Sequence, residues 1–208
     1  MAKNETAVTE AWSDEPAGRI AKALPDLVSQ IPDTSELPSA NPIDRVHAIA
    51  ENAALRTSIV SGSLALPLGP LGLLTLIPDL VSIWKIQAQM VADIAGAFGK
   101  KAYLDREQML YCLFRHAASQ AVCALVVGVG ERILVRRVTL RTLESITRQV
   151  GMRVTQRLIA KSVSRWLPIV GALGVAAYAY YDTTQVASTA IELFQKEIDI
   201  EEREPNAA

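Results

Sequence analysis

The two histidines of the chain, His47 and His116, are the first candidates for acid–base or metal chemistry. His47 precedes Glu51 by four residues in a segment of helical periodicity, so both side chains share one helix face. Such a pair can bind a metal or exchange protons. A metal needs more ligands than these two, and none lie nearby in the sequence. An ordinary surface pair is therefore the favoured interpretation, and His116 is expected at a helix surface or in local packing.

Asp79 and Asp182 are the two acids flanked by apolar helix. A buried carboxylate is costly, so each one suggests either a structural partner or a functional role. Asp79 follows Pro78 and is expected to cap the start of a helix, a contribution of about 1 kcal/mol. Asp182 is expected in mid-helix, as a buried acid paired with an arginine of the basic helix described below.

Motifs for nucleotide binding and nucleophilic catalysis are missing from the sequence. The turns GPLG and GALG lack the Lys-Ser/Thr of a phosphate-binding loop, and the surroundings of Ser61 do not match a nucleophile elbow. The sequence therefore predicts no catalytic residue, cofactor or metal. It favours a non-enzymatic protein, with an enzyme using His47, Glu51 or Asp79 as a remaining alternative. Cys112 and Cys123 stand eleven residues apart and are expected as reduced thiols.

A basic stripe is the clearest candidate binding surface. Its members recur every four residues and so follow one face of a predicted helix: Arg153, Arg157, Lys161 and Arg165. A cationic helix face can bind anionic lipid headgroups, at about 1 kcal/mol per basic residue. A solvated face that pairs with the acidic C-terminal segment is the alternative. Nucleic acid is not predicted as a partner, because few aromatic residues accompany the basic ones.

The chain of 208 residues is long enough for one domain with flanking segments, and half of its residues are hydrophobic. Residues 1–42 are rich in proline and acids and are expected to form a flexible arm, apart from a short docking turn that includes Leu24, Leu27 and Val28. Residues 43–196 form the predicted helical domain, and 197–208 an acidic tail that frays from Lys196. The polar N-terminus does not resemble a signal peptide, so a cytoplasmic location is expected.

Hydrophobic periodicity predicts an all-α fold, a single bundle of about five to seven helices. Helices are expected over 41–62, 79–101, 105–130, 131–166 and 166–194, although the β-branched run from Arg132 to Leu140 also fits a strand. Gly99 is expected to end the second helix. Two buried stripes are predicted. The first consists of Val46, Ala48, Ile49, Ala53, Leu55 and Ile59, and the second of Leu80, Ile83, Trp84, Gln87, Val91, Ile94, Ala95 and Phe98.

Two apolar stretches punctuated by glycine and proline separate these helices. Residues 57–78 and 166–181 contain no charged side chain, and the first is long enough to cross a membrane. Pro67 and Pro70 interrupt it, which argues against one continuous spanning helix. Each stretch could form a hairpin that enters the membrane or a buried part of a soluble bundle, and the sequence leaves both possibilities open.

The same two stretches resemble the EcsC family of bacterial proteins. The resemblance rests on GPLGLLTLIPDL followed by IAGAFG, and on LPIVGALGVAAYAYYDTTQVASTA, and it extends over residues 45–195. The residues that match the family motifs are Gly69, Gly72, Pro78, Asp79, Gly99, Pro168 and Gly171. Members often carry an asparagine in the second apolar helix, where this chain has Ala176, Ala177 and Tyr178. A related helical domain is attached to some bacterial GTPases.

The resemblance implies a helical, membrane-linked cytoplasmic protein without established catalytic residues. Together with the basic stripe, it predicts a non-enzymatic accessory or effector protein. The protein would lie at the cytoplasmic face of the inner membrane, either peripherally or with its hairpins inserted. The alternative is a soluble interaction module for a transporter, a GTPase or a secretion partner. A membrane surface or membrane protein is the expected partner, and an oligomer is possible.

Overall fold

The structure is a computed structural model that describes residues 23–24, 26–64, 72–116, 120–162 and 168–201. Within that part, residues 63–64, 72–79, 129, 154–162, 168–173 and 201 are described by their backbone alone. The helices are α3 (Pro42–Leu64), α4 (Gly72–Ala97), η1 (Lys101–Tyr103), α5 (Arg106–Phe114), α6 (Gln120–Cys123), α7 (Leu140–Ser162) and α8 (Pro168–Gln195). The predicted all-α fold class is confirmed, with a small sheet in addition.

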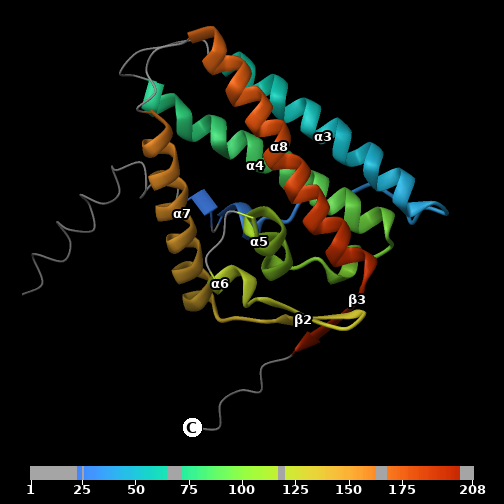
Figure 1. Cartoon of the computed structure of the whole chain (residues 1–208). Helices are drawn as coiled ribbons and strands as arrows, with labels where there is room; N and C mark the ends of the chain where they lie inside the picture. The colour runs from blue at the N-terminus through green and yellow to red at the C-terminus, as the bar shows by residue number, and fades with distance from the viewer. Residues whose placement is uncertain (1–22, 25, 65–71, 117–119, 163–167, 202–208) are drawn as a thin grey trace, which may run out of the picture.

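Helices α3, α4 and α8 form the centre of the molecule, and α5 packs against α4 and α8 (Figure 1). α3 and α8 run in opposite directions in close contact, since a Cβ at Gly62 would lie 3.5 Å from the Cβ of Ala176. Small side chains at this contact let the two backbones approach each other. The core also contains an edge-to-face pair of Trp84 and Phe114, whose ring centroids are 5.3 Å apart.

The C-terminal end of α4 is fixed by Gly99, as the sequence predicts. Gly99 has a φ of 70°, which glycine adopts without steric cost. Its N–H donates to the carbonyl of Gly96 at 2.8 Å, and the N–H of Lys100 donates to that of Ala95 at 2.7 Å. These two bonds form a Schellman motif that satisfies the last carbonyls of the helix.

The N-terminal end of α4 differs from the prediction. The helix begins at Gly72, so Pro78 and Asp79 lie inside it, and the prediction that Asp79 caps its start is wrong. The physical reason lies in Leu73, Leu74 and Leu76, strong helix formers that extend the helix toward the N-terminus. Pro78 forgoes one backbone hydrogen bond within the helix. Pro168, in contrast, is the first residue of α8, the position where proline is best tolerated.

A three-stranded sheet lies at one end of the molecule. β1 (Val126–Val129) pairs antiparallel with β2 (Arg132–Arg136), and β2 pairs in parallel with β3 (Glu197–Glu201). The predicted helix over 105–130 is therefore wrong beyond α6, and the alternative of a strand after Arg132 is confirmed. Valine-rich sequence and a tight turn at Gly130, which has a φ of 63°, favour a hairpin here.

The prediction that the chain frays from Lys196 is also wrong, because Glu197–Glu201 forms β3. Opposite charges support this strand. Arg132 lies 3.3 Å from the carboxylate of Glu197 and 3.6 Å from that of Asp199. Acidic residues that were predicted as a solvated tail thus pair with a basic residue of the neighbouring strand.

The predicted stripe of α3 is only partly correct. Val46, Ile49 and Ala53 are buried, whereas Leu55 and Ile59 are 47% and 69% exposed, and Ala48 is exposed as well. The inward face instead carries small residues, namely Ala54, Thr57 and Ser61. Small residues are favoured there because α3 packs closely against both α4 and α8. In α4, five of the predicted stripe residues are buried as expected: Trp84, Gln87, Val91, Ile94 and Ala95.

The segment before α3 lies along α4 over a longer stretch than the predicted docking turn. Leu24, Leu27 and Val28 are buried in the core. Further along, the Thr34 hydroxyl donates to the Asp93 carboxylate at 2.6 Å. The segment comes so close to α4 that a Cβ at Gly96 would lie 2.9 Å from the carbonyl oxygen of Glu36. A glycine is therefore required at this position of the helix.

We predict that Gly96→Ala destabilises the protein by about 1–3 kcal/mol, because the added methyl group meets backbone that cannot rotate away. Gly174→Ala is the matched control, since a Cβ there has nothing within 4 Å. It lies inside α8 and should stabilise the protein by about 0.5–1 kcal/mol through helix propensity. Urea unfolding measures both values. Equal stabilisation by the two alanines would contradict the close approach at Gly96.

Candidate functional site

A layer of polar side chains crosses the middle of the helical body, and we call it the polar layer. It consists of Thr57 of α3, Gln87 of α4, Asp182 and Thr183 of α8, and His116, which follows α5. The amide nitrogen of Gln87 donates to Asp182 Oδ2 at 2.9 Å and to Thr183 Oγ1 at 3.1 Å. The hydroxyls of Thr183 and Thr57 are 2.9 Å apart. The layer thereby joins three long helices.

The imidazole of His116 completes the layer from α5. Its Nε2 lies 2.8 Å from Asp182 Oδ1, and the two side chains are 20% and 19% exposed. Its other ring nitrogen, Nδ1, is buried and has no hydrogen-bond partner in the described part of the chain. One nitrogen is thus held by a carboxylate and the other is enclosed. In this geometry the pair ties α5 to α8.

The polar layer is costly to bury. Thr57, Gln87 and Thr183 have no exposed surface. Gln87 Oε1 and Ser61 Oγ are enclosed without a partner among the described residues. An unpaired buried polar atom costs about 1–3 kcal/mol. Polar groups in such a position restrict how the helices can pack, because other arrangements would leave more of them unpaired.

A shallow hollow of about 390 Å³ lies beside the polar layer. Its lining residues are Arg115, His116, Cys123, Gln185, Ser188, Thr189 and Glu192. Arg115 forms an ion pair with Glu192, and its guanidinium lies 5.5 Å from the centre of the Tyr111 ring. The hydrogen bond to Glu192 raises the pKa of Arg115. The charges of the hollow are therefore largely matched within the protein.

At the end of the bundle opposite the sheet, α3 and α7 end and α4 and α8 begin (Figure 1). We call this end the apical end. Five residues separate α7 from α8, and seven separate α3 from α4. A chain of that length spans at most about 20–28 Å, so both pairs of helix ends must be close. The contact between Gly62 and Ala176 places the end of α3 beside the start of α8.

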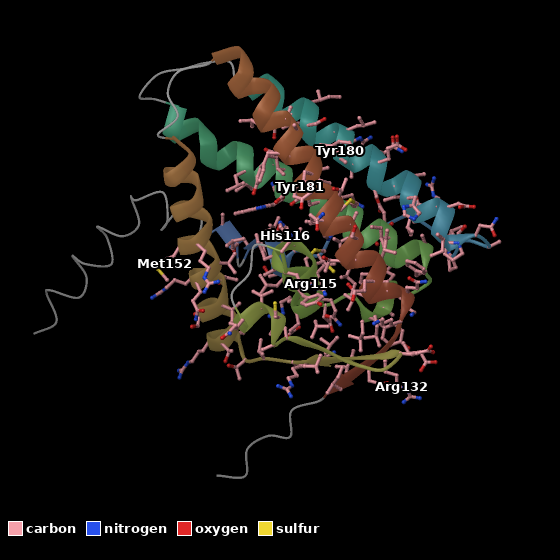
Figure 2. All side chains as sticks on the ribbon, viewed as in Figure 1. Arg115, His116, Arg132, Met152, Tyr180 and Tyr181 are labelled. Carbon is pink, nitrogen blue, oxygen red and sulfur yellow. The ribbon has the colours of Figure 1, made fainter. Side chains whose placement is uncertain are left out.

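The apical end therefore collects the described parts of both apolar stretches, 57–64 and 72–78 of the first and 168–181 of the second. No charged residue occurs between Arg56 and Asp79, or between Arg165 and Asp182. Large apolar and aromatic side chains are exposed on this half of α8: Val175 (46%), Tyr178 (49%), Tyr180 (39%) and Tyr181 (61%). Figure 2 shows Tyr180 and Tyr181 on the upper half of α8, with His116 and Arg115 below them. On α3 and α8, Thr57 and Asp182 of the polar layer mark the lower boundary of these uncharged stretches.

The structure corrects the predicted partner of Asp182. The carboxylate bonds to Gln87 and His116 rather than to an arginine of the basic helix. The physical reason is that α8 turns this side chain toward α4 and α5, whereas the basic residues Arg148 and Arg153 are exposed on α7. His116, expected in local packing or at a helix surface, thus has a long-range partner.

The other predicted site residues are placed as follows. Arg153 is exposed on α7, Arg157 and Lys161 lie in α7 where the backbone alone is described, and Arg165 and Gly69 lie outside the described residues. Gly72 begins α4, Pro168 begins α8, and Gly171 lies in the first turn of α8. His47 and Glu51 are both exposed on α3.

The sequence indicated two of the five residues of the polar layer as buried. Gln87 appears in the predicted buried stripe, and Asp182 was expected to be buried, but Thr57 and Thr183 were not identified. The pattern that could have identified them is a small β-branched residue that follows an alanine on the inward face of α3 and of α8. Pairing them requires knowing that the two helices cross at that level, which no local pattern reveals.

Two further properties can be stated for the described residues. No helix among them combines the length and apolar character needed to cross a membrane. Their His, Cys, Asp and Glu side chains form no group of three or more that could hold a metal ion.

Comparison with known proteins adds no relative. No family model matches the chain, and the searches of curated proteins and of solved structures found no match either.

Thr183 provides a direct test of the polar layer. We expect Thr183→Val to lower the free energy of unfolding by about 1–3 kcal/mol, because it leaves one amide hydrogen of Gln87 and the hydroxyl of Thr57 without this partner. Thr184→Val is the matched control, since among the described residues that exposed hydroxyl bonds only to the carbonyl of Tyr181. Its effect should stay within about 0.5 kcal/mol. Denaturant titration measures the free energy of unfolding of both variants. Similar small decreases in the two variants would contradict the polar layer.

The two cysteines should differ in reactivity. Cys112 is fully buried, which raises the pKa of its thiol, whereas Cys123 is exposed beside the hollow. Because the thiolate is the reacting form, a maleimide should label the native reduced protein once, and twice after unfolding. Intact-mass spectrometry counts the labels. Cys123→Ser should remove the native label, and rapid native labelling of Cys112 would contradict its burial.

Proposed function

We propose that the protein is a non-enzymatic membrane-associated accessory or effector protein. It attaches its apical end to the cytoplasmic face of a bacterial membrane. The observation that carries this proposal is the gathering of the described parts of two separate uncharged stretches, 57–64 with 72–78 and 168–181, at one end of the bundle. The charged sheet lies at the other end.

The exposed side chains of the apical half support attachment to a bilayer surface. Tyr178, Tyr180 and Tyr181 lie within four residues on α8 and keep between 39% and 61% of their surface exposed. Tyrosine has an apolar ring and a polar hydroxyl, and it concentrates at the boundary between lipid headgroups and acyl chains. Val175, one turn before Tyr178, adds an aliphatic group that can enter the acyl region.

The basic stripe supports an anionic lipid as the partner. It follows α7 from Arg153 through Arg157 and Lys161, and α7 ends at the apical end. Arg165 continues the spacing in the sequence. Basic residues near an anionic membrane contribute about 1 kcal/mol each, and salt weakens this attraction. Attachment is proposed to combine shallow apolar contact with this electrostatic term.

The resemblance to the EcsC family agrees with this proposal. Its motif residues Gly72, Pro168 and Gly171 begin or lie near the starts of the two helices that leave the apical end. In this proposal these residues shape the membrane-facing starts of α4 and α8. Membership of the family remains a prediction.

We predict that the protein floats with vesicles of phosphatidylglycerol and phosphatidylethanolamine, and does so less well at high salt or with phosphatidylcholine alone. Val175→Asp and Tyr181→Asp should each weaken binding by about fivefold to tenfold, because a carboxylate must then enter the interface. Ser188→Asp, exposed on the sheet-proximal half of α8, is the matched control and should bind normally. Arg153→Glu combined with Arg157→Glu tests the basic stripe.

The outcomes separate the alternatives. Extraction by alkaline carbonate indicates peripheral attachment, whereas retention in the pellet indicates an inserted hairpin. A soluble, folded protein that floats with none of these vesicles would overturn the proposal and favour a soluble interaction module. Equal binding by Tyr181→Asp and Ser188→Asp would show that another surface makes the contact.

A further inference from the structure

The outward face of α3 carries an exposed, largely apolar seam. Ala48, Asn52, Leu55 and Ile59 are all exposed, and they follow one another in steps of four, three and four residues. Leu55 and Ile59 retain 47% and 69% of their surface. This spacing is the heptad spacing by which two helices pack along each other. We call these four residues the α3 seam.

The residue types of the seam match its heptad positions. With Leu55 at position d, Asn52 and Ile59 occupy position a. In parallel coiled coils, isoleucine at a with leucine at d favours two strands over three or four. A single asparagine at position a fixes the register of such a pair, because each amide can bond to its copy. The seam therefore suits a second, identical helix.

Two opposite charges flank the seam on its two sides. Glu51 precedes Asn52 at position g, and Arg56 follows Leu55 at position e. Both side chains are exposed, and neither forms a hydrogen bond or ion pair within the described part of the chain. In a parallel pair, position g of one helix faces position e of the other, five residues further along. Glu51 then meets Arg56 of the second copy, and the contact occurs twice by symmetry.

The same charges disfavour an antiparallel pair. When two helices run in opposite directions, position g faces position g and position e faces position e. Glu51 at position g and Arg56 of the copy at position e then lie on opposite sides of the seam, so neither opposite-charge contact forms. The charge pattern thus favours the parallel direction.

We propose that the α3 seam binds a second copy of this chain as a parallel two-stranded contact. This inference does not depend on attachment to a membrane. The seam is about 17 Å long, which makes a small interface, so the dissociation constant should be on the order of 10–100 µM. Helix formation adds no cost, because α3 is already folded against α4 and α8.

Charge exchange between two variants gives the sharpest test. Glu51→Arg places two arginines on each copy, and Arg56→Glu places two glutamates, so each variant should dimerise at least about tenfold more weakly than the natural chain. An equimolar mixture of the two variants restores both opposite pairs and should recover the dimer. Lys85→Glu, an exposed reversal on α4, is the matched control and should leave the dissociation constant unchanged. Sedimentation velocity across the micromolar range measures each constant.

Leu55→Asp tests the apolar part of the seam and should abolish the dimer while circular dichroism remains native. Direction is tested by Asn52→Cys in a Cys123→Ser background, since position a faces its own copy only in the parallel pair. Mild oxidation should then cross-link the two copies, whereas Asp44→Cys in the same background should not. A natural chain that stays monomeric at several hundred micromolar, or a charge-exchange mixture that fails to recover, would overturn the proposal.

Discussion

The structure depends on hydrogen bonds made by one turn of α8. Thr183 receives a hydrogen bond from Gln87 of α4 and contacts the hydroxyl of Thr57 on α3, while its neighbour Asp182 bonds to Gln87 and to His116. These bonds require the three long helices to meet at one level. Small residues make this possible, since Gly62 and Ala176 let α3 and α8 approach closely. Close packing and polar bonding therefore support each other.

The polar layer also divides the molecule by charge. On the sheet side, Arg132 pairs with Glu197 and Asp199, and ion pairs recur at Arg115 and Arg137. On the apical side α3 and α8 carry no charged residue, and α8 exposes tyrosines. A protein with this division can meet an apolar surface with one end and remain hydrated at the other. In the proposed function, the layer limits how deeply the bundle can enter the interface, because Asp182 and Gln87 would have to give up their partners.

The sequence predicted those features that local periodicity encodes. It predicted the long helices, the buried stripe of α4 and the glycine that ends this helix. Each of these features depends on residues within a few helical turns. The predictions that failed concern residues whose partners are distant in the sequence. The acids after Lys196 form a strand because β2 presents Arg132, and Asp182 finds His116 because α5 folds back onto α8. Leu55 and Ile59 fit a helical stripe in the sequence, yet they point outward because smaller residues face the neighbouring helices.

That outward position gives α3 two different faces. The direction in which two α3 helices pair determines where the apical ends of the two copies lie. The inward face holds Thr57 in the polar layer, and the outward face holds Leu55 and Ile59 in the α3 seam. A parallel pair formed through the seam has its symmetry axis along α3, so both apical ends face the same side. Two weakly attaching ends on one assembly bind a surface much more tightly than one, because the second attachment is intramolecular. An antiparallel pair would point the two ends in opposite directions. The order of Glu51 and Arg56 along α3 therefore favours the one geometry in which dimerisation would strengthen attachment at the apical end.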